Sequence, residues 1–225
     1  MKTYETQLTA QQHLLRVVPQ GYCWWTAGVI PLEKRDVLAE KFADIYGTRL
    51  GKDRRYDRKR RGLANAEAVA AMDGSVLRWV LVATDGDGPV HEKERLRDAR
   101  TSSGRILWGD DYLLQESRRA TTRGGGTHWS WWLTRECESR TAKYADLAAK
   151  TNPDELASYV KMQLNRPLHS GVRTQLAKIF RRAKTVQAHH FPNWPWVGPD
   201  PDHLPFITGF RSGTSAHTGP CSDDD

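Results

Sequence analysis

The sequence predicts an α+β protein, in which strands and helices are mixed at first and helices alone follow. The clearest strand is the apolar run at residues 75–84, and Asp73-Gly74 precedes it as a hairpin signal. Apolar residues recur at helical spacing over residues 32–46 and again over 171–187. With 225 residues, 38% of them hydrophobic, the chain is large enough to enclose a core of this mixed class.

The first predicted strand covers residues 22–30 and leads into the first helix. Pro31 suits the first helical position, where its missing N–H has no partner to lose, and Gly47 suits the end of the helix. A hairpin of two strands, 65–72 and 75–84, follows. The alanines of the first of these strands would also suit a helix, in which case only a mixed α/β class remains.

A short charged helix is predicted at residues 89–100, and a strand at 105–116 that bends near Gly109. The order up to residue 116 is then β-α-β-β-α-β, which is the ferredoxin-like order. In such a fold the helices cover one face of an antiparallel sheet. The other face is left free for a ligand, or is covered by the C-terminal helices.

An added strand is predicted at residues 128–133, and three helices follow it at 135–150, 152–165 and 171–187. The second of these begins with an Asn cap, a Pro and a Glu, which together form a strong start signal. We therefore expect three parts: a ferredoxin-like α/β core at 1–134 with a basic loop at 48–62, a helical part at 135–188, and a Pro/Gly-rich, disordered tail at 189–225.

Positive charge is concentrated in one segment, residues 49–61. The chain has 34 Lys and Arg against 27 Asp and Glu, and this segment alone has eight basic and two acidic residues. Such a cluster on an otherwise balanced chain is typical of a binding site for a polyanion. The guanidinium group of Arg can donate two hydrogen bonds to one phosphate and can also stack on bases. We expect a loop or a solvated helix with these nucleic-acid contacts: Arg49, Lys52, Arg54, Arg55, Tyr56, Arg58, Lys59, Arg60 and Arg61.

Two further elements are candidate contacts. The helix at 171–187 has a face without acids that carries Lys178, Arg181, Arg182 and Lys184, and it is either a second contact surface or an ordinary solvated face. Arg123 begins a glycine-rich loop whose backbone could approach a phosphate, or which simply joins two strands. Trp129 and Trp131 share one strand face, which either stacks on bases or packs in the core.

Several classes of protein are disfavoured by the sequence. Cys23, Cys137 and Cys221 lie far apart and outside any CxxC pair, so we expect neither a zinc finger nor a disulfide framework. The histidines show no metal-ligand spacing, and there is no P-loop, dinucleotide fingerprint or nucleophile elbow. We expect no cofactor and no metal. The absence of a long apolar window or an apolar leader predicts a cytoplasmic protein without a membrane partner.

The element order, the basic segment and the loop at residues 123–127 give the chain a distant resemblance to the CRISPR repeat-processing endoribonucleases of the RAMP superfamily. In that superfamily the RNA 2′-hydroxyl attacks the adjacent phosphate without a metal, helped by a His or Arg near the first helix or in the glycine loop. The resemblance implies Arg35 and His128 as catalytic candidates. The chain departs from the family in lacking a second readable repeat and the usual alternating glycines.

The sequence therefore predicts a nucleic-acid-binding protein, with RNA favoured over DNA, that processes a structured RNA by metal-independent cleavage or binds it without catalysis. Its partners would be the nucleic acid and other subunits of a ribonucleoprotein. Two alternatives remain: a DNA-binding accessory or regulatory protein of a plasmid or integrative element, and an adaptor whose basic segment binds an acidic protein.

Overall fold

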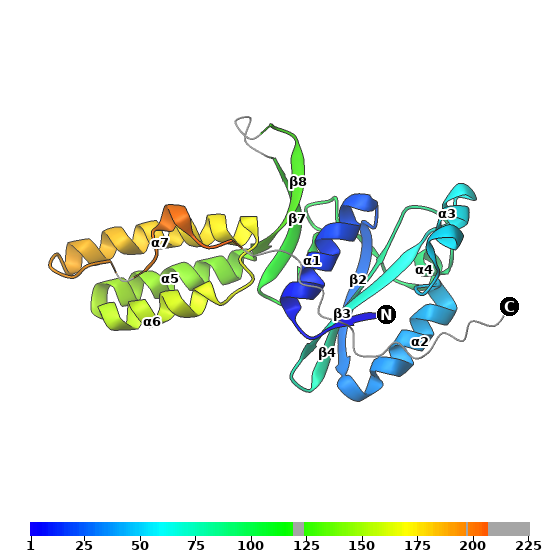
Figure 1. Ribbon diagram of the computed structural model, residues 1–225, viewed down its shortest axis with the longest axis horizontal. Helices are drawn as coiled ribbons and strands as arrows, with labels where there is room; N and C mark the ends of the chain where they lie inside the picture. Colours follow the sequence, from blue (N-terminus) through cyan, green and yellow to red (C-terminus); the bar gives the residue numbers. More distant parts are fainter. Residues whose placement is uncertain (119–123, 197, 207–225) are drawn as a thin grey trace. The chain divides into compact units, whose positions relative to one another are not determined.

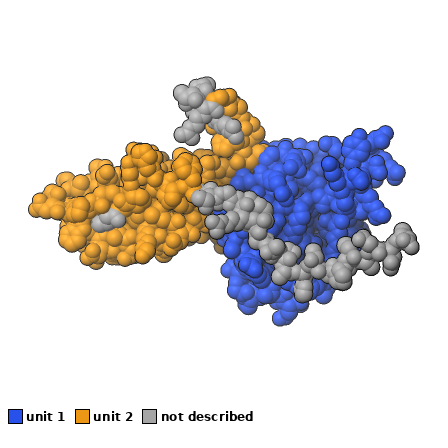
Figure 2. Space-filling model, viewed as in Figure 1, with its two compact units in different colours: residues 1–104, 209–225 blue, residues 105–208 orange. Residues whose placement is uncertain are grey.

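The computed structural model describes residues 1–118, 124–196 and 198–206 (Figure 1). The chain divides into two compact units, which meet in the sequence between Gly104 and Arg105 (Figure 2). This point lies well before residue 134, where the sequence suggested the end of the first part. No helix in the described ranges is long and apolar enough to cross a membrane.

The first unit is built on a five-stranded sheet in the order β1-β3-β4-β2-β5. β1 runs parallel to β3, and the other neighbours are antiparallel. The strands are β1 (Lys2–Tyr4), β2 (Trp24–Pro31), β3 (Ala66–Asp73), β4 (Val76–Ala83) and β5 (Arg97–Asp98). The helical segments are α1 (Gln7–Val17), η1 (Val18–Gln20), η2 (Leu32–Lys34), α2 (Arg35–Tyr46), α3 (Lys52–Arg60) and α4 (Pro89–Lys93).

Several local predictions for this unit are confirmed. The β3–β4 hairpin pairs Asp73 with Val76 across a two-residue turn, so the segment predicted at 65–72 is a strand, Ala66–Asp73, and not a helix. Gly47 ends α2 in the left-handed conformation, with φ of 67°. The helix predicted at 89–100 is wrong beyond its first turn, because the chain is extended at Glu94 and pairs with β2 as β5.

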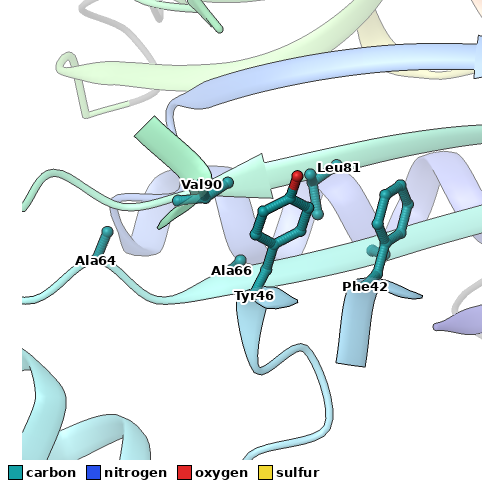
Figure 3. Packing of buried hydrophobic residues seen from close by; sticks show 8 residues of the cluster. Phe42, Tyr46, Ala64, Ala66, Leu81 and Val90 are labelled. Atoms are coloured by element: carbon teal, nitrogen blue, oxygen red, sulfur yellow. The ribbon is translucent and has the colours of Figure 1, made fainter. Parts of the chain in front are cut away.

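Both faces of β3 are covered. On one face, Figure 3 shows the rings of Phe42 and Tyr46 from α2 packed over β3 and β4, beside Leu81 and Val90. On the other face, α1 lies against β3, and its His13 hydrogen-bonds with Glu67. The sequence did not predict β1 or α1. The second sheet face, expected to be free for a ligand or covered by the C-terminal helices, is covered by α1 at β3.

The α+β class is confirmed. Residues 105–116 are extended with an interruption near Gly109, as predicted, but the interruption is a hairpin turn and the two strands lie outside the first sheet. These residues form a hairpin, β6 (Ile106–Trp108) and β7 (Tyr112–Arg118), in a separate sheet of the second unit. The turn is made possible by Gly109, whose φ of 62° lies in the left-handed region. The strand that pairs with β2 at the edge of the first sheet is the short β5, not residues 105–116. The ferredoxin-like description of the first unit stays a prediction.

The second unit joins a three-stranded sheet, β6-β7-β8, to helices. Trp131 of β8 is fully buried and meets Trp108 edge to face, which places it in the core of this unit. The Asn152 side chain caps the second helix as predicted, by accepting from the amides of residues 154 and 155. The remaining elements are β8 (Thr127–Leu133), α5 (Arg135–Thr151), α6 (Pro153–Leu164), α7 (Ser170–His190) and η4 (Pro201–His203).

The segment predicted as a disordered tail begins inside a helix. His189 and His190 form the last turn of α7, and η4 packs against α7 with Leu204 buried beside it. Residues 207–225, the larger part of that predicted tail, lie outside the described ranges.

Candidate nucleic-acid interface

The basic segment forms a separate helix, α3, at one edge of the first unit (Figure 1). Its charges agree with the helix dipole, because Asp53 lies in the first turn and Arg58, Lys59 and Arg60 lie in the last. None of its residues is buried, so apolar packing does not hold it in place.

Two arginines on the inner side of α3 attach it to the sheet. Arg55 donates from Nη1 to Glu67 Oε2 at 2.8 Å and from Nη2 to the Thr48 carbonyl at 3.2 Å. Arg58 donates from Nε and Nη2 to the Ala64 carbonyl, at 3.2 and 2.7 Å. Asn65 adds a bond from Nδ2 to the Arg55 carbonyl, at 2.9 Å. Arg55 and Arg58, which the sequence predicted as ligand contacts, therefore serve to fix the helix.

The other charged residues of α3 are exposed. We call Arg54, Tyr56, Lys59, Arg60 and the C-cap residue Arg61 the outer face, and the exposed acids Asp53 and Asp57 lie among them. Tyr56 is 63% exposed, and the Arg60 guanidinium lies 5.9 Å from the centre of its ring. Within the described part of the chain, no carboxylate forms an ion pair with these four cations. They are free to meet the charges of a ligand.

The anchor of α3, Glu67, is the centre of a buried polar cluster. Its carboxylate, 4% exposed, accepts from Lys2 Nζ at 2.7 Å, from Arg55 and from His13 Nε2. His13 is fully buried, and its Nδ1 accepts from Tyr4 Oη at 2.9 Å and from an Arg16 guanidinium at 3.1 Å. Because Arg can only donate, Nδ1 carries no proton and the Nε2 proton faces Glu67.

These contacts shift the pKa values in the cluster. Burial opposes the charge on Glu67, but the hydrogen bonds from His13, Lys2 and Arg55 prevail and hold the pKa of this carboxyl far below its usual range. Burial lowers the pKa of His13, with Glu67 acting against that shift, and burial raises the pKa of Tyr4. The sequence analysis missed this cluster. The available signal was a glutamate inside an otherwise apolar strand, which must find partners when buried.

A pocket of about 620 Å³ opens where the cluster meets the N-terminal end of α3. Its lining includes Glu67, the exposed Arg49 and Lys52, and the side of Arg55. A second hollow, of about 440 Å³, shares Arg49 and Lys52 and adjoins the first turn of α3. The other lining residues of the larger pocket are Met1, Lys2, Gln20, Tyr22, Thr48, Leu50 and Ala68.

The second predicted basic surface, on α7, is partly neutralised. Arg181 pairs with Asp202 at 2.9 Å and Arg182 with Asp146 at 2.6 Å. Lys178 and Lys184 are exposed. This helix belongs to the second unit, and α3 belongs to the first.

The predicted catalytic residues also lie on different units. Arg35 begins α2 and pairs with its neighbour Asp36 at 2.9 Å. His128 lies on β8, with its Nε2 3.5 Å from Ser170 Oγ and its Nδ1 buried without a partner among the described residues. Arg123 lies outside the described residues. Across the described ranges, no three His, Cys, Asp or Glu side chains form a group that could hold a metal ion.

Comparison of the chain with protein-family models, with curated proteins and with solved structures finds no match.

Proposed function

We propose that this chain binds nucleic acid, RNA in preference to DNA, through the outer face of α3. The observation that carries the proposal is a fixed helix with an exposed tyrosine and four exposed cations that have no ion-pair partner among the described residues. Arg55 and Arg58 fix the helix from the inside, so the outer side chains bind a ligand without first ordering the backbone.

The chemistry of the outer face favours a phosphate backbone over an acidic protein. Three of its four cations are Arg, whose planar fork matches phosphate oxygens in pairs. Tyr56 adds a flat ring on which an unpaired base can stack, for about 1–3 kcal/mol. RNA-binding proteins usually recognise unpaired bases, and they do so beside a basic surface. For this reason we propose that RNA binds more tightly than DNA.

The test uses a single-stranded RNA and a DNA of the same sequence, each labelled, with affinities measured by fluorescence anisotropy across a salt series. Four phosphate contacts predict that log affinity falls with log salt at a slope of about 3. Changing Arg54, Lys59, Arg60 and Arg61 to Ala should remove most of that slope and most of the affinity. None of these residues is buried, so the variant should fold as the parent does.

A charge-matched control removes four exposed cations from α5 and α6 instead: Arg135, Lys143, Lys150 and Lys161. If net charge alone drives binding, the two variants lose equal affinity and the proposal fails. Equal affinity of the parent for RNA and DNA would refute the preference for RNA. Binding of neither would refute the proposal and leave the acidic-protein alternative.

The cleavage implied by the resemblance to RAMP-superfamily endoribonucleases is tested in the same samples. RNA incubated with the protein in EDTA should yield fragments with 2′,3′-cyclic phosphate ends if the 2′-hydroxyl is the nucleophile. Arg35→Ala and His128→Ala should then slow cleavage and leave binding intact. Uncut RNA would reduce the proposal to binding alone.

A further inference from the structure

The pocket beside α3 has a strong excess of positive charge. Four cationic side chains, Lys2, Arg49, Lys52 and Arg55, line it together with a single acid, Glu67. The Glu67 carboxylate already accepts from Lys2, His13 and Arg55. This carboxylate is therefore neutralised by partners within the cluster, whereas Arg49 and Lys52 at the mouth of the pocket are exposed to solvent.

Two buried donors along this pocket have no partner. The Thr48 hydroxyl lies in a residue only 7% exposed, and neither Thr48 Oγ1 nor Arg55 Nε has a hydrogen-bond partner in the described ranges. A buried donor without an acceptor costs about 1–3 kcal/mol. Both atoms are shielded from solvent, so an acceptor-rich group in the pocket would remove that cost once the side chains around them shift slightly.

The N-terminal end of α3 adds further donors. Gly51 caps the helix without a side chain, so the amides of the first turn have no side-chain acceptor. The second hollow, which shares Arg49 and Lys52 with the pocket, lies against this turn and is also lined by Arg54 and by one acid, Asp53. The cations, the unpartnered hydroxyl and the helix end together favour a small ligand with a concentrated negative charge.

We infer that this pocket binds the terminal phosphate of the nucleic-acid strand that lies on the outer face of α3. A terminal phosphate carries close to two negative charges at neutral pH, whereas a phosphate inside the strand carries one. The volume of about 620 Å³ is that of a small-molecule site and holds one nucleotide, not a duplex. The role of the pocket in strand recognition rests on the nucleic-acid binding proposed above.

The experiment compares one RNA sequence with a 5′-phosphate, a 3′-phosphate or hydroxyls at both ends. The parent protein should bind one of the phosphorylated strands about tenfold more tightly than the hydroxyl strand. Replacing Arg49 and Lys52 by Ala should bring this ratio close to one. Arg60→Ala with Arg61→Ala serves as the matched double variant, because it should weaken all strands and keep the ratio.

Thr48→Val is the finer test. It removes the hydroxyl, keeps the shape of the side chain and leaves every charge in place. The ratio should fall severalfold, while the melting temperature should stay the same or rise, because a buried unpartnered hydroxyl is gone. A ratio that is unchanged in Thr48→Val and in the Arg49/Lys52 variant would overturn the inference.

The experiment distinguishes a wrong inference about the pocket from a wrong proposal about strand binding. If the parent binds strands but ignores their end groups, the inference is wrong and the function proposed above stands. If no strand binds, a nucleoside 5′-monophosphate is tested against the nucleoside by thermal shift. A rise in melting temperature with the monophosphate alone, lost in the Arg49/Lys52 variant, would support a phosphate pocket without a strand. No rise would overturn the pocket as well.

Discussion

Replacing Glu67 by Gln should strongly destabilise the first unit. The side chain is 4% exposed, and its two oxygens accept from Lys2, His13 and Arg55. An amide keeps the shape, but it removes the charge opposite Arg55 and turns an N–H group toward at least one of these donors. Removing one partner of a buried ion pair costs about 3–5 kcal/mol. Lys2 is half exposed and adds little, so we expect a loss of about 3 kcal/mol.

The assay is urea unfolding followed by hydrogen exchange, which separates the amides of the first unit from those of the second. Protection should fall in α1, β3 and α3 together, because Glu67 touches a residue from each of the two helices. Glu40→Gln, on the exposed side of α2, is the matched control and should change stability by less than about 0.5 kcal/mol. Equal stability of the two variants would refute the reasoning.

The same variant should change the response to acid. The pKa of Glu67 in the folded protein lies below its ordinary value of 4.5, so its stabilising effect is complete above that value and is lost as the pH falls below it. The parent should therefore lose stability more steeply than Glu67→Gln below about pH 4.5. Parallel curves in this range would mean that the carboxylate is not held by its partners.

Two further predictions concern the second unit. Burial lowers the pKa of His169 to about 4 from an ordinary 6.5, so its neutral form supports the fold above 6.5 and about 3 kcal/mol is lost as the pH falls from 6.5 toward 4. His169→Gln should flatten that slope in acid-unfolding curves, and an unaltered slope would assign it to other groups. Gly171→Ala should destabilise by about 2 kcal/mol, because its Cβ would clash with the Trp131 carbonyl oxygen and lie 2.5 Å from the Trp132 ring. A melting temperature equal to the parent's would show that both the backbone and the ring shift without cost.

The elements with strong local signals could be predicted from the sequence. The two-residue hairpin turn after Asp73, the glycine that ends α2 and the Asn152 cap each depend on a few neighbouring residues, and each lies where the pattern indicates. In contrast, α1 turns Gln11 and His13 toward the protein, and both are fully buried. Because these polar residues interrupt the inner face, the sequence lacks the helical spacing of apolar residues that would have predicted α1.

The candidate site, like the fold, could be predicted from the sequence only in part. Composition alone located the basic segment, but it could not distinguish Arg55 and Arg58 from their neighbours. A helix whose residues are all charged except Tyr56 has no apolar stripe to show which side faces the protein, and the partners of these two arginines come from other segments. Glu67 and the pocket depend on residues brought together from β1, α1 and α3, and no local pattern encodes that meeting.

The anchoring of α3 by polar contacts has a consequence for how its specificity could evolve or be engineered. Because no outer-face side chain supports the core, each of these positions can be randomised at little cost in folding. A library that varies Arg54, Tyr56, Lys59, Arg60 and Arg61 while keeping Arg55 and Arg58 would sample new recognition surfaces on an unaltered scaffold. The residues that fix the helix and the residues that are exposed on it therefore occupy different positions of the same short segment.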